Sequence, residues 1–427
     1  MGMTITEKIL ARAASKSRVV PGEFLDCKVD QVATMDLQGK LVFNTLEKLG
    51  VVKAFDRQRF AVCLDHQSPA HTIAIAEVHA AIRKKAKAFA LEQVMDVGSG
   101  IMHVVMPERG LILPGELVIM NESHTPTGGA LGACVVGVGQ TDAAVAAAMG
   151  EVWLVVPETI RIDLHNQLNS GVTAKDIALH LMKTLGYERK AIYKTIEIGG
   201  PGAQTLQMDQ RFTITNYCSD MGAKSAIFEP DAVTLDYVSS RAKRAFHPLV
   251  SDADCSYLER IAVDLSSLEP LVACPDALDN IHLVTDVADV AIQQAHIGTC
   301  TNGRLSDIKA AADILNGRKV AEDVRLIVVP ASREVYQKAM SAGYLEILSE
   351  AGAVIMAPGC GPCMGEHSGV LASGETCISS GNRNMKGRMG SKDSAVYLAS
   401  AETVAASALT GRITDPRTLA QQNIIGS

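Results

Sequence analysis

Three cysteines lie in segments whose spacing favours metal or redox chemistry. Cys300 lies in Gly-Thr-Cys-Thr-Asn-Gly-Arg (298–304), and Cys360 with Cys363 forms a glycine-flanked Cys-x-x-Cys pair. The pair places two sulfurs on one tight turn, and a third thiolate comes from elsewhere in the chain. Three thiolates leave one iron of a [4Fe–4S] cluster without a protein ligand and able to act as a Lewis acid. A zinc site completed by His367, a thioredoxin-like redox pair and unrelated thiols are the alternatives.

The length and composition of the chain indicate several α/β domains. Its 427 residues are about three times a common domain of roughly 150 residues, and 47% of them are hydrophobic. Aromatic residues make up only 4%, which favours tightly packed α/β layers over an aromatic-rich β-sandwich. Ten cysteines are too dilute for a disulfide scaffold. The remaining ones are therefore expected to be core residues: Cys27, Cys63, Cys134, Cys218, Cys255, Cys274 and Cys377.

The charge balance and the N-terminal sequence argue against two classes of partner. A net charge of −7 without a block of lysine and arginine disfavours nucleic acid, because phosphate binding needs a concentrated basic face. The first residues lack the apolar core of a signal peptide, and no stretch reaches about 18 apolar residues without a charge. We therefore expect a cytoplasmic protein that binds neither nucleic acid nor a membrane.

Short β-branched runs that alternate with Ala/Leu-rich segments predict βαβ units. The expected strands cover residues 60–64, 116–120, 324–330 and 353–357. The expected helices cover residues 73–89, 141–149, 174–186 and a segment from the N-cap Ser332 to about 342. Ligands of such sheets bind beyond the carboxyl ends of the strands. Asp65-His66, the segment 121–124 and Gly359-Cys360 follow predicted strands and are expected there.

Two changes of pattern, near Pro157 and within 265–280, predict domain boundaries. We expect α/β domains over residues 1–157, 158–277 and 278–427. The glycine-rich run 129–139 has no Gly-x-Gly-x-x-Gly turn, so it predicts close packing and not a dinucleotide site.

Several motifs in order along the chain resemble those of the aconitase superfamily. The cysteine segments and Asn-Arg-Asn-Met-Lys-Gly-Arg (382–388) carry the resemblance, which runs from about Val29 to Pro416. Within the superfamily the chain looks like the large subunits of the two-chain isopropylmalate isomerase and homoaconitase branch. The resemblance implies a hydro-lyase of three α/β domains packed around a [4Fe–4S] cluster, with Cys300, Cys360 and Cys363 as the ligands.

The resemblance also implies roles for acid–base residues. Elimination of water needs a base for the proton on carbon, an acid for the leaving hydroxide and cationic or metal clamps on the carboxylates. Asp65 and His66 match the pair that protonates the departing hydroxyl in the family. His103 and His124 match histidines near the cluster, and Glu122 and Asp220 match acidic positions of the site.

A second set of residues matches positions that face the substrate or the cluster. Arg383 and Arg388 match arginines that hold substrate carboxylates, for which a planar guanidinium suits better than an ammonium. The polar members expected beside them are Ser123, Asn216, Asn302 and Asn382. Arg304 is expected to begin a helix and is not assigned to the site.

Two acidic positions depart from the common pattern of the family. Glu122 stands where most relatives have Asp, and Asp220 stands where many have Glu. One side chain is longer and the other shorter by a methylene, so the reach of each changes by roughly 1.5 Å while its charge is kept. If both face the cluster, they are expected to compensate for each other. Met35-Asp36 stands where true aconitases have Gln-Asp, which weakens the case for citrate.

The pattern lacks the mobile fourth domain of single-chain aconitases, which carries a Ser-Arg pair whose serine is the base. The resemblance therefore implies a small partner subunit with this swivelling domain and a small di- or tricarboxylate substrate. The leading hypothesis is dehydration and isomerisation of 3-isopropylmalate and 2-isopropylmalate in leucine biosynthesis. Homoaconitate and 2,3-dimethylmalate are alternatives, as is a zinc-dependent lyase. An iron-responsive RNA-binding protein is disfavoured by the acidic charge and the missing domain.

Overall fold

The first sheet is built from the N-terminal part of the chain. The computed structural model describes residues 2–186 and 189–419. In the first sheet every pair of neighbouring strands is parallel. Its order is β4 (Gln93–Met95), β3 (Phe60–Cys63), β2 (Gln31–Met35), β5 (Leu117–Met120) and β6 (Cys134–Gly137). The helices of this part are α1 (Ile5–Ala13), α2 (Asp36–Lys48), α3 (Ile73–Ala88), α4 (Met102–Glu108) and α5 (Gln140–Met149), with a 3₁₀ helix η1 (Thr125–Leu131).

The second sheet is also parallel throughout. Its order is β10 (Ser225–Phe228), β9 (Thr195–Gly199), β8 (Thr159–His165) and β11 (Glu259–Asp264). The helices of this segment are α6 (Ala174–Leu181), α7 (Met208–Cys218) and α8 (Ala232–Ser239). β1 (Phe24–Lys28) and β7 (Glu151–Val155) form a separate antiparallel pair. This pair joins the segment before the first sheet to the segment that follows α5.

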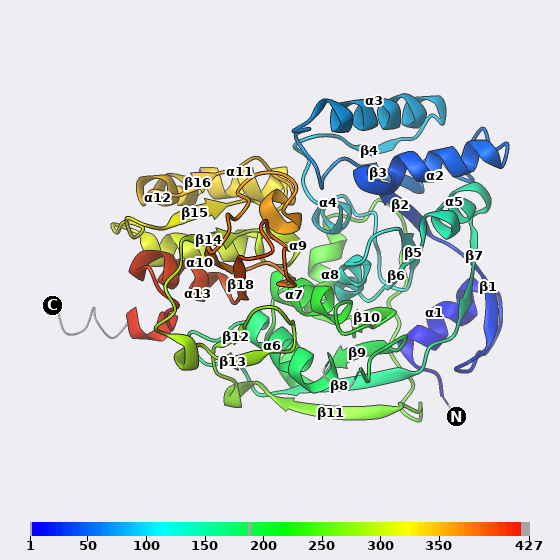
Figure 1. Ribbon diagram of the computed structural model, residues 1–427. Coiled ribbons are helices and arrows are strands. Elements are labelled where there is room, and N and C mark those ends of the chain that lie inside the picture. Colours follow the sequence, from blue (N-terminus) through cyan, green and yellow to red (C-terminus); the bar gives the residue numbers. More distant parts are fainter. Residues whose placement is uncertain (1, 187–188, 420–427) are drawn as a thin grey trace.

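The third sheet is mixed. Its strands run in the order β13 (Ile281–Leu283), β12 (Leu271–Ala273), β18 (Ala395–Leu398), β17 (Thr376–Ser379), β14 (Gln294–Ile297), β15 (Arg325–Val328) and β16 (Val354–Ile355). β12 is antiparallel to both of its neighbours, and the other neighbours are parallel. The helices of this part are α9 (Thr299–Asn302), α10 (Leu305–Leu315), α11 (Arg333–Ser341), α12 (Tyr344–Glu350) and α13 (Ala401–Thr410). Three α/β units result, and Figure 1 shows them around a common centre.

Most elements predicted from the sequence are confirmed. The expected strands are observed as β3, β5, β15 and β16, and the expected helices as α3, α5, α6 and α11. Ser332 caps α11, since its hydroxyl accepts the N–H of Val335 at 3.1 Å. The helix predicted to reach residue 186 is α-helical only to Leu181 and continues as a π-helical turn over Met182–Gly186. An added Cβ at Gly129 would lie 1.6 Å from the carbonyl oxygen of Ala226, as the prediction of close packing requires.

The boundaries between the units follow from the strand order. The chain leaves the second sheet after Asp264 and enters the third at Leu271, within the predicted interval 265–280. Cys377 and Leu398 of the third sheet nevertheless pack in the hydrophobic core of the second unit. The exact limits 1–157, 158–277 and 278–427 therefore stay a prediction, and residues 1, 187–188 and 420–427 lie outside the described part.

The remaining cysteines occupy the positions expected of core residues. Cys27, Cys63, Cys134, Cys218, Cys274 and Cys377 are buried free thiols, and Cys255 is half-buried. Among the described helices none is long and apolar enough to cross a membrane.

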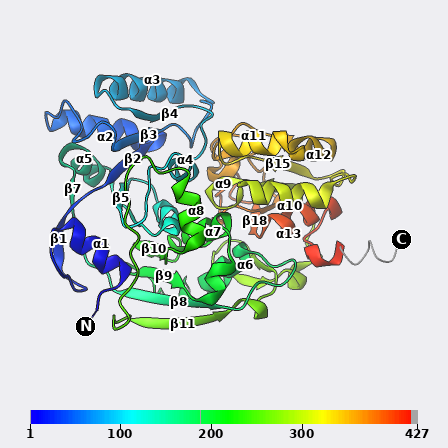
Figure 2. The same ribbon diagram turned by 180° about the vertical axis from the view of Figure 1, so that it is seen from behind.

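Loops after several parallel strands meet where the first and third units face each other. Figure 2 shows α4, α7 and α9 in the middle of the molecule, between the sheets. Asp65 and His66 follow β3, and the segment 121–124 follows β5. On the other side, Cys300 follows β14 and Asn382 follows β17. The strand ends thus position the predicted site residues, as the βαβ pattern indicates.

Candidate active site

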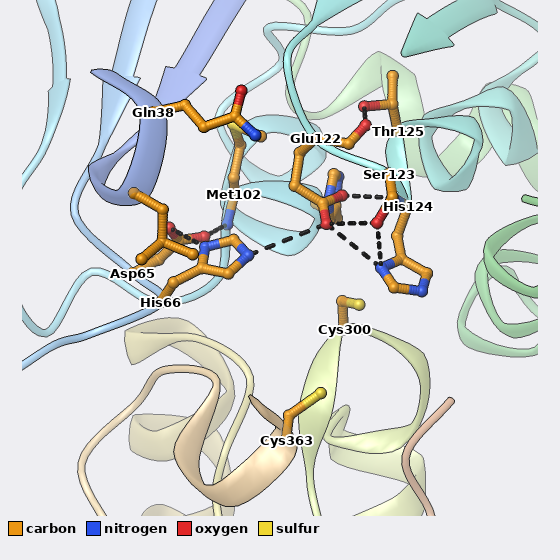
Figure 3. A network of polar contacts seen from close by, with 12 residues as sticks. Gln38, Asp65, His66, Met102, Glu122, Ser123, His124, Thr125, Cys300 and Cys363 are labelled. Atoms are coloured by element: carbon orange, nitrogen blue, oxygen red, sulfur yellow. Dashed lines mark hydrogen bonds and ion pairs between the residues drawn. The ribbon is translucent and has the colours of Figure 1, made fainter. Parts of the chain in front are cut away.

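The three cysteines of the predicted ligand set lie on one wall of a cavity of about 210 Å³. Cys300 lies on the short helix α9, and Cys360 and Cys363 lie at a 3₁₀ turn over Gly361–Met364. Their sulfur-bearing side chains pack together beside Ile101 and Val104 of the first unit. Figure 3 shows Cys300 and Cys363 directed across the cavity toward His66, Glu122 and His124.

Polar groups around the sulfurs suit metal-bound thiolates. The side-chain amide of Asn216 donates to Sγ of Cys300 at 3.1 Å, and that of Asn382 lies 3.5 Å from the same sulfur. The Arg388 guanidinium lies 3.6 Å from Sγ of Cys363. Burial raises the pKa of Cys300 to about 12, so its thiolate needs a positive charge to form. N–H donors directed at buried sulfurs are the surroundings that an iron–sulfur cluster requires, and these residues fit one.

His367, the fourth ligand of the zinc alternative, is already engaged. Its Nε2 lies 2.8 Å from the carbonyl oxygen of Pro69, and its Nδ1 lies 2.7 Å from Oγ of Ser368. The His/Cys/Asp/Glu groups of the described residues that converge within ligand distance are Asp65, His66 and Cys360. Asp65 is hydrogen-bonded to His66 and to the backbone N–H of Met102. A zinc ion bound by Asp65, His66 and Cys360 would have to break the hydrogen bond between Asp65 and His66.

His66 is held as a protonated imidazole with one nitrogen facing the cavity. Its Nδ1–H donates to Asp65 Oδ1 at 2.8 Å, and Asp65 Oδ2 accepts the N–H of Met102 at 2.7 Å. Burial alone lowers the pKa of His66, but the charge and hydrogen bond of Asp65, with Glu122 and Asp36, raise it to about 10. The Nε2 atom lies 3.9 Å from Glu122 Oε1. The side chain therefore carries a proton toward the cavity at neutral pH.

Asp36 supports this pair and was not predicted as a site residue. It is buried at the start of α2, where it accepts the backbone N–H of His66 at 3.2 Å and of Gln67 at 2.9 Å. His79 Nε2 of α3 lies 3.2 Å from Asp36 Oδ2, the oxygen that also accepts from Gln67. Its position in the sequence could have indicated a site residue, because Asp36 directly follows β2 at the same edge of the sheet where Asp65 follows β3.

Glu122 is an ionised carboxylate between histidines. It accepts from Nε2 of His103 at 2.5 Å and from the backbone N–H of His124, and Ser123 Oγ donates to it at 3.0 Å. Burial raises the pKa of Glu122, but His103 and His124 outweigh it and hold this pKa well below its usual range.

Glu122 and Asp220, the two departures from the family pattern, meet on one imidazole. Nδ1 of His124 lies 3.3 Å from Glu122 Oε1, and Nε2 lies 3.2 Å from Asp220 Oδ2. Although burial lowers the pKa of His124, Asp220 and Glu122 raise it to about 9. The longer and the shorter carboxylate thus contact one ring from opposite sides, and compensation between their lengths stays a prediction.

The two arginines point guanidinium groups into the cavity. Arg383 donates from Nε to Asp220 at 2.7 Å and from Nη2 to Ser123 Oγ at 3.0 Å. Nε of Arg388 is buried and has no hydrogen-bond partner within the described part of the chain. A buried donor without a partner is costly, so this atom is suited to an anionic ligand. The arrangement can hold a carboxylate opposite the acid His66.

Asn216 and Asn302 lie behind the cysteine loop and not on the cavity wall. Asn216 is buried against Thr127, Thr301 and Asn382 as well as Cys300. The Asn302 amide donates to Asp307 and Thr213, and its side chain lines a separate cavity of about 540 Å³. Of the predicted substrate-facing residues, the structure brings Ser123, Asn382, Arg383 and Arg388 to the wall.

Comparison with known proteins gives full-length similarity to one family. The model of the Aconitase family (aconitate hydratase) matches residues 7–289 and 276–411. The 3-isopropylmalate dehydratase large subunit 1 of Pyrococcus abyssi is 47% identical, over 97% of this chain and 99% of that protein. The "Probable methanogen homoaconitase large subunit" of Methanothermobacter thermautotrophicus is 43% identical, over 97% and 98% of the two chains. A crystal structure of Thermococcus kodakaraensis aconitase X matches at a TM-score of 0.49 and 15% identity, over 88% and 89%.

Proposed function

The chain belongs to the aconitase family, and we propose that it is the catalytic large subunit of a two-chain hydro-lyase that interconverts 3-isopropylmalate and 2-isopropylmalate in leucine biosynthesis. One observation carries the proposal. A single cavity is lined by the three cysteines, by His66, whose Nδ1 is held by Asp65, and by Arg383 and Arg388. These are the parts that elimination of water from a hydroxy-dicarboxylate needs, apart from the carbon base.

Membership of the family implies an iron–sulfur cluster. We assign a [4Fe–4S] cluster to Cys300, Cys360 and Cys363. The sulfur of Cys300 accepts from Asn216 and Asn382, and that of Cys363 accepts from Arg388. When bound, the cluster supplies an iron without a protein ligand, which polarises oxygen atoms of the substrate. The ten free thiols and such a cluster both suit the reducing cytoplasm, where we place the protein.

The residues of the chain orient the substrate and supply the acid. Asp65 fixes the His66 imidazole through Nδ1, so that the proton on Nε2 is donated to the departing hydroxyl oxygen. Arg383 and Arg388 bind the substrate carboxylates, and Ser123 holds the Arg383 guanidinium in place. Glu122 and Asp220 hold the His124 ring in the cavity wall, with one ring nitrogen directed at each carboxylate.

The carbon base comes from a small partner subunit that carries the swivelling domain with a Ser-Arg pair. The Pyrococcus abyssi relative is a large subunit, which supports such a partner. Ser123 on the cavity wall is committed elsewhere, because its Oγ donates to Glu122 and accepts from Arg383. Ser379, the next candidate within the chain, is buried against His296 Nδ1 at 2.9 Å, away from the cavity wall.

The test is anaerobic reconstitution followed by titration with the partner. We expect about four irons and four sulfides per chain, no turnover by the chain alone, and formation of the unsaturated dicarboxylate once the partner is added. Ultraviolet absorbance of this intermediate measures the rate. Stoichiometric zinc without iron, or full activity of the isolated chain, would contradict the proposal.

Homoaconitase is the second candidate function, favoured by the 43% identity to the methanogen protein. Both substrates carry the carboxylate and hydroxyl groups that the residues of the cavity wall bind, so this wall suits either substrate. Comparing kcat/KM for isopropylmalate and homoaconitate in the reconstituted complex decides between them. A higher value for homoaconitate would replace the leading proposal.

A further inference from the structure

Lys175 is a fully buried lysine behind the catalytic cavity. It lies in the first turn of α6, in the second unit, and its exposed fraction is 0%. Its side chain reaches the back of two loops of the third unit, one with Cys300 and one with Asn382 and Arg383. Neither the sequence motifs nor the acid–base network of the cavity uses this residue.

The Lys175 ammonium joins these two loops. Nζ donates to the carbonyl oxygens of Gly381 at 2.5 Å and Ser380 at 2.8 Å, and it lies 3.5 Å from Oδ1 of Asn302. Tyr217 adds a second donor, because its hydroxyl donates to the same Gly381 oxygen at 3.0 Å. The ammonium also lies 4.6 Å from the centre of the Tyr217 ring.

Burial of the Lys175 side chain costs free energy, because its charged form loses its hydration. Burial is the main cause that lowers the pKa of Lys175 to about 7, and the charges of Asp307 and Asp176 oppose it only partly. The charged and the neutral amine each have N–H groups for the two carbonyl oxygens, so the contacts do not depend on the charge. An apolar side chain of similar length would fill the site without this cost. The ammonium is therefore explained by the carbonyl groups that it binds.

The loops need such support because their backbone is irregular. Thr299, directly before Cys300, has a φ of 74°, which a β-branched residue rarely adopts. The Ser380 and Gly381 carbonyls lie beyond the last residue of β17, so no strand or helix of the sheet orders them. The Asn302 amide, held by Lys175 and Asp307, ties the end of α9 to the same point.

We infer that Lys175 is a positioning residue for the substrate site: it fixes the loop of Asn382 and Arg383 against the loop of Cys300. The distance between the Arg383 guanidinium and the cysteine wall is then set from behind by the amine of one residue of the second unit. Only the expected effect of Lys175 on KM rests on the proposed function. The fixed geometry of the two loops is a property of the chain without substrate or cluster.

The test compares Lys175→Met with a milder and a matched variant. Tyr217→Phe removes only the second donor to Gly381. Lys224→Met is the matched control, because Lys224 also donates to a backbone carbonyl, that of Gly137 at 3.1 Å, and lies 5.4 Å from a tyrosine ring, but it touches neither loop. Each variant is measured as cluster-free chain by hydrogen exchange, and as reconstituted complex with its partner for kcat and KM.

For Lys175→Met we expect faster hydrogen exchange confined to residues 299–303 and 380–384, and a KM increased about tenfold or more with a much smaller change in kcat. The reason is the loss of the hydrogen bonds to Ser380 and Gly381, which orient the loop of Arg383 and not the acid His66. Tyr217→Phe should shift both readouts in the same direction by less, and Lys224→Met should change neither.

Unchanged exchange and KM in folded Lys175→Met would overturn the inference. If that variant does not fold, Tyr217→Phe decides: unchanged loop exchange there overturns it, and faster exchange in the two loops supports it. If the wild-type complex turns over no hydroxy-dicarboxylate, the proposed function fails, while the exchange data still decide the role of Lys175.

Discussion

The two walls of the catalytic cavity are built in different ways. On the first unit's wall, carboxylates and imidazoles hold one another, as in Asp65 with His66 and in Glu122 with His103. On the third unit's wall, Cys300 and Arg383 stand on irregular loops supported from behind by Asn216 and other residues of the second unit. Figure 3 shows the first wall as a continuous set of contacts, with Cys300 and Cys363 opposite it.

This difference indicates how each wall responds to change. The acid–base wall is complete in protein atoms, so loss of one member should alter chemistry and leave the wall in place. The buried thiols of the cysteine wall have raised pKa values and form thiolates only with a cation, so the chemistry of this wall depends on a group that the chain does not supply. The following experiments test this contrast, from the largest expected effect to the smallest.

The largest effect is expected for Cys300→Ser. The change replaces a sulfur ligand by a hydroxyl, so the cluster should be lost together with its Lewis-acid chemistry, and turnover should fall about 10³-fold or more. Iron content and visible absorbance after anaerobic reconstitution measure the loss. Cys255→Ser, at a half-buried cysteine outside the cavity, is the control. Full iron content in Cys300→Ser would remove Cys300 from the ligand set.

The next effect is expected for His66→Ala. The variant should keep its iron and lose about 10²–10⁴-fold in kcat, the usual contribution of a general acid. Asp65→Asn should do similar harm, because it removes the acceptor that orients Nδ1. The exposed His282 provides a control variant, His282→Ala. Near-normal turnover of iron-loaded His66→Ala would reject His66 as the acid.

The sequence predicted the residues whose chemistry is visible in local motifs. Cys300, Cys360 and His66 stand in short segments at strand ends, and the parallel strands bring those ends together. The sequence did not predict a role for Lys175, because this residue lies in a predicted helix, where a lysine usually indicates a solvent-exposed face. Which side of a loop faces the cavity is likewise a tertiary property, and Asn302 lies on the side away from it.

The fold shows the same division. The strands β3, β5, β15 and β16 carry β-branched apolar runs and were predicted. By contrast, β12 and β13 comprise Leu271–Ala273 and Ile281–Leu283, and runs this short carry no periodic signal. These strands form because they pair antiparallel at one edge of the third sheet. This pairing depends on tertiary structure and cannot be predicted from the local sequence.

A third effect concerns a contact between the first and third units outside the cavity, where Glu108 of α4 accepts from Ser332 Oγ at 2.6 Å. Burial raises the pKa of Glu108 to about 7 from an ordinary value near 4.5. The folded chain therefore keeps a proton that the unfolded chain loses, so this group's stabilisation is complete below pH 4.5 and is lost as the pH rises through about 7. Glu108→Gln does not titrate and should escape this loss.

Denaturant unfolding of the cluster-free chain at several pH values measures this effect. The free energy of unfolding of Glu108→Gln relative to wild type should increase by about 2–3 kcal/mol between pH 4.5 and 8. Glu346→Gln, at an exposed glutamate of α12, should show no such change. A difference independent of pH would mean that Glu108 is ionised in the folded chain and that this contact between the first and third units does not depend on protonation.

The smallest effect concerns the paired departures Glu122 and Asp220. Each contacts a different nitrogen of His124, at 3.3 Å and 3.2 Å. Glu122→Asp should withdraw one carboxylate by roughly 1.5 Å, and Asp220→Glu should crowd the ring from the other side by a similar amount. Each change alone is expected to lower kcat/KM about tenfold, because the ring and the Arg383 guanidinium bound to Asp220 are displaced.

The double variant separates compensation from independence. Independent positions would multiply their losses to about 100-fold, whereas carboxylates that share one ring should recover most of the wild-type rate when their lengths are exchanged. The four proteins form a double-mutant cycle in kcat/KM, with iron content as the control for an intact cysteine wall. A coupling of about 1 kcal/mol or more is expected. Additive losses would show that His124 is held by the backbone of its own loop, and that the acid–base wall does not depend on the mutual contacts of its side chains.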